Sequence, residues 1–153
     1  RLGYVGTITK VNIETVTDLL EKGYIPVIST VGCDKDGNTY NINADTASAF
    51  IAGALGAKRL IMMTDISGIL KDKDDPNTLI PEITISQAKK LFEEGVISGG
   101  MIPKVDCCIE AINKGVQKVI IMDGRVPHSI LMELFTDEGA GTEVVGDETK
   151  GEA

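Results

Sequence analysis

Apolar residues recur along this chain with two periods, one typical of helices and one typical of strands. A spacing of three to four residues between apolar positions predicts helices at residues 12–23, 44–56, 84–95, 99–115 and 126–135. Short runs rich in Val and Ile predict strands at residues 24–31, 58–65, 117–124 and 141–145. Because helices and strands alternate, we expect an α/β fold with a mostly parallel sheet between layers of helices, a three-layer sandwich.

Polar and turn-forming residues mark the ends of several of these elements. Asn12 is expected to cap the first helix, and Thr84 or Ser86 the third. The dipeptide Asp36-Gly37 is a typical hairpin turn, so a hairpin is expected there.

The two ends of the chain raise a separate expectation. The chain begins at Arg1 without a Met, and residues 2–11 alternate between apolar and polar positions as a strand or hairpin does. A lone hairpin is marginally stable in water, so we expect these 153 residues to be one half of a longer protein. Residues 1–146 are expected to form one domain and the polar residues 147–153 a disordered tail.

Composition limits the kinds of partner and ligand expected for this protein. A net charge of −8 argues against binding to nucleic acid, which usually requires a basic surface. No apolar run approaches the roughly 18 residues that span a membrane. Three cysteines without a CxxC spacing, together with a single histidine, indicate reduced thiols and no metal site. We therefore expect a cytoplasmic protein without a membrane or nucleic-acid partner.

Three predicted strands are followed by polar or glycine-rich segments, which are STVG from Ser29, TDISG from Thr64 and DGRVPH from Asp123. In parallel sheets, ligands bind at the carboxyl ends of the strands. Glycine allows the backbone to approach a ligand closely. These three segments are therefore candidate parts of one binding site.

The segment SGGMIPK is a candidate anion site. Gly99 and Gly100 precede a predicted helix, and Lys104 lies in its first turns. The free N–H groups and the dipole of a helix start favour an anion, and a lysine adds a positive charge. The alternative is a plain glycine turn with a solvated lysine. The chain contains neither GxxxxGK[ST] nor GxGxxG, so the usual phosphate-binding loops are absent from the sequence.

The segment YNINADTAS leaves two interpretations open. Asp45 stands where a helix is expected to begin, so it is either a helix cap or a ligand-binding residue. Asn41 and Asn43 by themselves suit a turn.

Four motifs in this order, NINADTAS, TDISGIL, GVISGGMIPKV and FTDEGAGT, together resemble the C-terminal half of enzymes of the amino acid kinase family. The resemblance is strongest to the branch that acts on N-acetyl-L-glutamate, and it covers Leu2 to about Val145.

The resemblance implies a reaction and a set of site residues. ATP, with Mg²⁺ held mainly by its phosphates, would phosphorylate the side-chain carboxylate of N-acetyl-L-glutamate in arginine biosynthesis. Lys104 and a lysine of the other half would flank the transferring phosphoryl group, and Asp45 would hold both lysines in place. Asn41 would bind the substrate. Asn43 is left as structural. The nucleotide contacts would be Thr64, Asp65, Ile66, Ser67, Gly68, Ile69, Leu70, Val96, Ile97 and Ser98.

The resemblance also assigns glycine-rich loops and a second lysine to the other half of the enzyme. We therefore expect this chain alone to be inactive or nearly so. A homo-oligomer is expected for the full-length protein, and the family allows a nitrogen-signalling partner protein. Two alternatives remain: another member of the family (glutamate 5-kinase, aspartokinase, carbamate kinase or uridylate kinase), or a non-catalytic nucleotide-binding or regulatory module.

Overall fold

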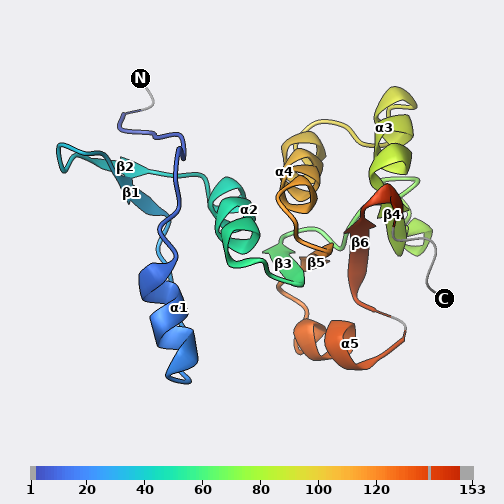
Figure 1. Ribbon diagram of the computed structural model, residues 1–153. Coiled ribbons are helices and arrows are strands. Elements are labelled where there is room, and N and C mark those ends of the chain that lie inside the picture. Colours follow the sequence, from blue (N-terminus) through green and yellow to red (C-terminus); the bar gives the residue numbers. More distant parts are fainter. Residues whose placement is uncertain (1–2, 138, 149–153) are drawn as a thin grey trace.

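The computed structural model describes residues 3–137 and 139–148 of the chain (Figure 1). Its elements, in chain order, are α1 (Glu14–Glu21), β1 (Val31–Cys33), β2 (Thr39–Asn41), α2 (Ala44–Leu55), β3 (Arg59–Thr64), the 3-10 helix η1 (Pro76–Thr78), β4 (Glu82–Thr84), α3 (Ile85–Glu93), α4 (Met101–Asn113), β5 (Lys118–Asp123), α5 (Ser129–Phe135) and β6 (Gly141–Val145). In the described part of the chain, no helix is long and apolar enough to cross a membrane.

The main sheet has four strands in the order β3-β5-β6-β4. The β3–β5 and β4–β6 pairs are parallel, whereas β5 and β6 run antiparallel. Helices α2, α4 and α3 pack beside one another, and Figure 1 shows α4 and α5 on opposite sides of the strands. The expected α/β class, with a mostly parallel sheet between helix layers, is therefore confirmed.

The core lies between β5 and the helix layer. Val119, Ile121 and Met122 of β5 have no solvent-exposed surface. Cys108 of α4 is equally buried, and its Sγ lies 3.6 Å from Sδ of Met62 in β3. This burial raises the pKa of the Cys108 thiol to about 12 and keeps that thiol in its neutral form.

The start of α3 follows the sequence closely. Thr84 caps the helix and forms a capping box with Gln87, because each side chain accepts a backbone N–H of the other residue. The carboxylate of Asp147, the first residue of the expected tail, accepts hydrogen bonds from the N–H and hydroxyl of Ser86 at 2.9 and 2.8 Å. Residues 149–153 of that tail lie outside the described residues.

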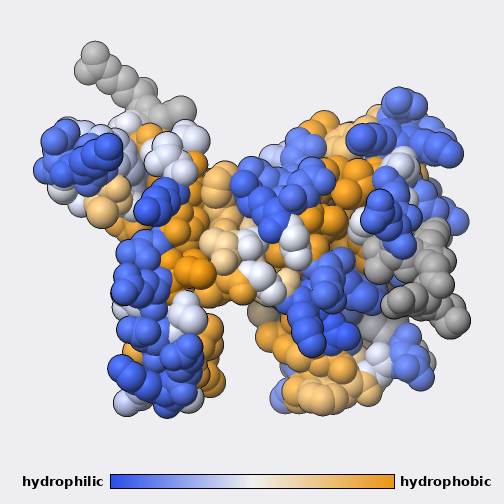
Figure 2. Space-filling model, viewed as in Figure 1, coloured by the Kyte–Doolittle hydropathy of each residue, from blue (hydrophilic) through white to orange (hydrophobic). Residues whose placement is uncertain are grey.

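The strand expected at residues 24–31 does not form. Ile25 is 90% exposed and Val27 is 96% exposed, and only residue 31 of this stretch belongs to a strand. A buried strand needs neighbouring strands to satisfy its N–H and C=O groups, and within the described residues no strand pairs with residues 24–29. Of the strand or hairpin predicted at residues 2–11, the described residues 3–11 form one bridge, Val5 to Asn41. Figure 2 shows apolar surface near the segment that joins α1 to β1.

The hairpin expected around Asp36-Gly37 is confirmed. Strands β1 and β2 pair antiparallel, and Gly37 has a positive φ of 82° at the turn. The carboxylate of Asp34 accepts hydrogen bonds from the side chain and N–H of Asn38, from the hydroxyl of Tyr40 and from the N–H of Asp36. These bonds, with those from Asn38 the most important, lower the pKa of Asp34 from 3.8 to about 2.

Candidate functional site

The topology brings several element ends to one edge of the sheet. Helix α2 leads into β3 and α4 leads into β5, so each helix runs back across the sheet before its strand. Because β3 and β5 are parallel, the amino-terminal ends of α2 and α4 lie at the same edge as the carboxyl ends of both strands. We refer to this edge, with the residues around Asp45, Lys104, Thr64 and Asp123, as the site edge.

Two charged side chains meet across the site edge. Asp45 is the second residue of α2 and Lys104 the fourth residue of α4, and Lys104 Nζ lies 3.5 Å from Asp45 Oδ2. Their side chains are 32% and 24% exposed, respectively. Partial burial strengthens the electrostatic attraction between the two side chains, and the remaining exposure leaves them accessible to a ligand.

Asn43, and not Asp45, caps α2. The Asn43 side-chain oxygen accepts the N–H of Thr46 at 3.0 Å. The capping role that the sequence left open for Asp45 thus belongs to Asn43, whose expected structural role is confirmed. The Asp45 carboxylate interacts instead with Lys104.

The glycine turn before α4 limits how an anion can be bound. The N–H of Met101 donates to the carbonyl of Ser98, the N–H of Ile102 donates to that of Gly99, and Pro103 has no N–H. The helix start therefore offers fewer donors than its sequence indicated. The side chain of Lys104 and the helix dipole remain as the attractive features. Space remains as well, because a Cβ placed on Gly100 would meet no atom within 4 Å.

The segment Thr64–Leu70, which we name the first strip, follows directly from β3. The Thr64 hydroxyl accepts the N–H of Ile66 at 3.1 Å, which forms a tight turn at the strand end. The carbonyl of Thr64 accepts the N–H of Gly124 at 2.9 Å, which joins this turn to the segment after β5.

The middle of the first strip is anchored in the interior. Gly68 has a φ of 142°, and a Cβ there would lie 2.5 Å from Thr142 Oγ1. Ile69 is 1% exposed, and its N–H donates to that same hydroxyl at 2.8 Å. Gly68 and Ile69 therefore fix the middle of the strip against the protein interior. Asp65 is exposed, and Ser67 and Leu70 are half-buried.

The segment Val96–Ser98, the second strip, joins α3 to α4. Ile97 is 2% exposed, and its N–H donates to the carbonyl of Leu91 at 3.1 Å. Val96 is half-buried and Ser98 is exposed. The strip therefore has one anchored residue between two that reach the surface.

Asn41 ends β2, four positions before Asp45. Its N–H donates to the carbonyl of Tyr4 and its carbonyl accepts the N–H of Gly6, so its backbone is fixed. Asn41 as a whole is exposed. The structure thus connects Asn41 to the start of α2 and leaves the residue exposed.

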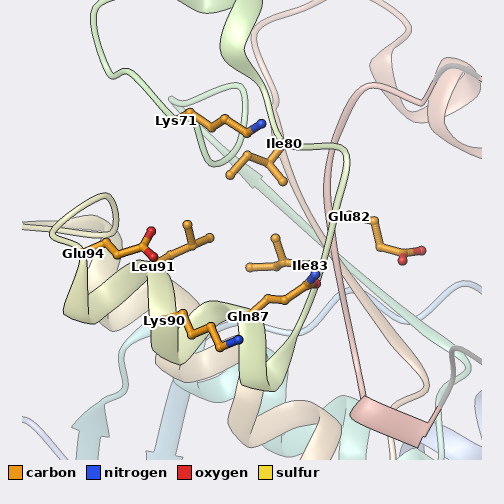
Figure 3. A pocket seen from close by; sticks show the side chains of 8 residues that line it. All are labelled: Lys71, Ile80, Glu82, Ile83, Gln87, Lys90, Leu91 and Glu94. Atoms are coloured by element: carbon orange, nitrogen blue, oxygen red, sulfur yellow. The ribbon is translucent and has the colours of Figure 1, made fainter.

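A groove of about 350 Å³ is lined by eight residues that lie outside both strips (Figure 3). Lys71 directly follows the first strip, and Leu91 is the hydrogen-bond partner of the second. Apolar side chains are flanked by charged ones, and the lining is Lys71, Ile80, Glu82, Ile83, Gln87, Lys90, Leu91 and Glu94. A second cavity, of about 410 Å³, includes Arg59 and Lys118. These two residues begin β3 and β5 and therefore lie at the edge opposite the site edge.

The sequence assigned no role to Arg125, which the structure brings to the site edge. Its Nη2 atom donates to the carbonyl of Asp65 at 2.6 Å and to Asp123 Oδ2 at 2.8 Å. Hydrogen bonds from the Arg125 side chain and N–H lower the pKa of Asp123 to about 2. The only signal in the sequence was the position of DGRVPH at the end of a strand.

The fold is an α/β fold in which the ends of two parallel strands, the lysine–aspartate pair and the first strip lie at one edge of the sheet. The chain matches the amino acid kinase family over residues 1–123 and belongs to that family.

Curated relatives indicate which branch of the family the chain resembles. The chain is 58% identical to the acetylglutamate kinase of Clostridium beijerinckii and 55% identical to that of Clostridioides difficile, over 92% of its length in each case. It is 52% identical to the acetylglutamate kinase of Nostoc sp. over 96% of its length. These matches span 50%, 49% and 50% of the relatives, so the chain spans about half the length of the curated relatives it matches. The resemblance to the acetylglutamate branch is thereby confirmed.

Solved structures support the same fold. A structure of N-acetylglutamate synthase from Neisseria gonorrhoeae, complexed with coenzyme A and L-arginine, matches 93% of this chain with a TM-score of 0.83 and 29% identity. The chain covers 32% of that protein. A structure of isopentenyl phosphate kinase matches 90% of this chain, with a TM-score of 0.64 and 26% identity, and the chain covers 52% of it.

Proposed function

We propose that the full-length protein containing this chain transfers the γ-phosphoryl group of ATP to the side-chain carboxylate of N-acetyl-L-glutamate, a step of arginine biosynthesis. The observation that carries the proposal is the Lys104–Asp45 pair at the site edge. Identity of 58% to an acetylglutamate kinase over 92% of the chain supports the choice of acceptor.

Lys104 would stabilise charge on the transferring group. A carboxylate oxygen of the substrate forms a bond to the γ-phosphorus, the bond from that phosphorus to the bridging oxygen breaks, and ADP leaves. Negative charge spreads over the phosphoryl oxygens during this transfer, and a positioned cation stabilises it. Asp45, 3.5 Å from Lys104 Nζ, would restrict the lysine to one direction.

The remaining site residues would bind the two substrates. Asn41 would contact N-acetyl-L-glutamate, and the exposed parts of the two strips would contact the nucleotide. The open space beside Gly100 fits a phosphate next to Lys104. Mg²⁺ would be held mainly by the nucleotide phosphates, where it neutralises charge.

The proposal also covers the setting of the full-length enzyme. We propose a cytoplasmic homo-oligomer, with a nitrogen-signalling protein as a further partner. Sedimentation velocity of the full-length protein would test the oligomer, and a monomer at micromolar concentration would contradict it.

A second candidate is a non-catalytic module of a larger protein. The match to N-acetylglutamate synthase at a TM-score of 0.83 favours it, because this chain covers only 32% of that protein. Titration with ATP alone, followed by N-acetylglutamate alone, separates the two candidates. A kinase half is expected to bind ATP, whereas binding of N-acetylglutamate without any binding of ATP would favour a regulatory module.

A chimera provides the test of catalysis. This chain is joined to the N-terminal half of the Clostridium beijerinckii relative, and ADP release is followed with each candidate acceptor. We expect turnover with N-acetyl-L-glutamate and far less with glutamate, aspartate, carbamate or UMP. Turnover that prefers one of those acceptors, or ADP release that no acceptor increases, would contradict the proposal.

A further inference from the structure

Arg125 connects the ends of two strands through its guanidinium group. Nε donates to Asp123 Oδ1 at 2.9 Å and Nη2 donates to Asp123 Oδ2 at 2.8 Å, which is a two-pronged contact with the carboxylate. The same Nη2 atom also donates to the carbonyl of Asp65 at 2.6 Å. Asp123 is itself well placed to hold the arginine, because its side chain is only 16% exposed.

The position of this contact matters more than its strength. Thr64 and Asp123 are the last paired residues of β3 and β5, and Asp65 is the first residue beyond that ladder. Past this point β5 no longer holds the first strip through strand pairing. The Arg125–Asp65 bond continues the attachment by one residue, at the turn where the strip leaves the sheet.

We infer that Arg125 is a positioning residue, which fixes the peptide of Asp65 and thereby the course of the first strip. An exposed ion pair by itself contributes little to global stability, and the Arg125 side chain is 69% exposed. The effect is therefore local: the strip is held in one course while the sheet keeps its stability. The consequence for nucleotide binding rests on the proposed function, whereas the effect on the strip does not.

Hydrogen exchange measured by mass spectrometry tests the effect on the strip. In Arg125→Ala we expect exchange in a peptide over residues 64–70 to accelerate about tenfold, the loss equivalent to one charge-assisted hydrogen bond. A peptide over residues 118–122 and the melting temperature are expected to stay nearly unchanged. Arg59→Ala removes another exposed arginine, at the opposite end of β3, and serves as the matched control.

Arg125→Lys separates geometry from charge. Lysine keeps the positive charge but lacks the planar fork that reaches Asp123 and Asp65 together. We expect this variant to exchange nearly as fast as Arg125→Ala over residues 64–70. Wild-type exchange in Arg125→Ala, or full rescue by lysine, would overturn the inference.

Titration of the same variants with ATP tests the consequence. We expect the dissociation constant to rise about tenfold in Arg125→Ala and lysine not to restore it. Full rescue by lysine would make Arg125 a simple attraction for phosphate and overturn its positioning role. If the wild-type chain binds no ATP, the proposed function fails, and the exchange data still decide whether Arg125 positions the strip.

Discussion

The Nζ atom of Lys104 lies 3.5 Å from Oδ2 of Asp45, although 59 positions separate the two residues in the sequence. A carboxylate near the start of α2 is favoured by the helix dipole, but a lysine near the start of α4 is opposed by it, by about 0.3–1 kcal/mol. The lysine is thus placed against the local preference of its own helix. That arrangement suits a negatively charged ligand, which both the dipole and Lys104 attract.

Replacement of Lys104 by alanine should reduce the rate of the chemical step in the chimera. Lys104 would meet charge that develops mainly in the transition state, so its loss should cost about 3 kcal/mol, or roughly a hundredfold or more in kcat. The KM values for ATP and N-acetylglutamate should change far less. Steady-state kinetics check this, and a near-normal kcat with a raised KM for ATP would make Lys104 an ordinary ground-state contact.

Asp45→Asn should damage catalysis more than folding. The substitution removes the charge that faces Lys104 and leaves the cap at Asn43 in place. A misplaced group beside reacting atoms can cost about a hundredfold in rate. The melting temperature and kcat should be measured on the same sample.

Asn43→Ala provides the matched control for that substitution. It removes the cap of α2 and should cost about 1 kcal/mol of stability while leaving the Lys104–Asp45 contact in place. An Asp45→Asn variant with unchanged kcat would count against a role for Asp45 in the reaction.

The chain by itself should bind adenine nucleotide weakly and turn over no N-acetylglutamate. Both strips and Lys104 are present, but the chain spans about half the length of its curated relatives. Calorimetric titration with ATP and a coupled assay of ADP release measure the two properties. Acetylglutamate-dependent turnover by the purified chain would show that this half is sufficient.

Acid should weaken the turn between β1 and β2 through Asp34. The pKa of this carboxyl is lowered from 3.8 to about 2 in the folded chain. Its contribution to stability is therefore present above about pH 4 and is lost as the pH falls towards 2. The difference in free energy of unfolding between wild type and Asp34→Ala should shrink across this range, with Asp36→Ala as the matched control. A difference that stays constant from pH 5 to pH 2 would contradict the assignment.

Local sequence signals were sufficient for most elements of the sheet and its helix layers. Thr84 with Gln87 forms the expected cap of α3, and Gly37 forms the expected turn. These features depend on contacts within a few residues, which a short stretch of sequence already contains. The sequence could not decide between Asn43 and Asp45 as the cap of α2, because both residue types are good caps and only the backbone geometry distinguishes them. In the structure, Asn43 is the cap.

Features that depend on residues far away in the sequence could not be predicted from local sequence patterns. The apolar run at residues 24–31 has the composition of a buried strand, but strand pairing is decided by partners elsewhere in the chain. Arg125 was missed for a similar reason, since its contact to Asp65 spans 60 positions. Lys104 and Asp45 were paired by family resemblance, and their spacing alone gives no reason to bring them together.

A double-mutant cycle on Lys104 and Asp45 in the chimera tests the central claim most directly. The kcat is measured for wild type, Lys104→Ala, Asp45→Ala and the double variant. If Asp45 acts by holding Lys104, its loss does no further harm once the lysine is gone. We therefore expect the double variant to be about as slow as Lys104→Ala. Losses that multiply, with the double variant slower by the product of the two single effects, would show that the residues act independently and would contradict this account.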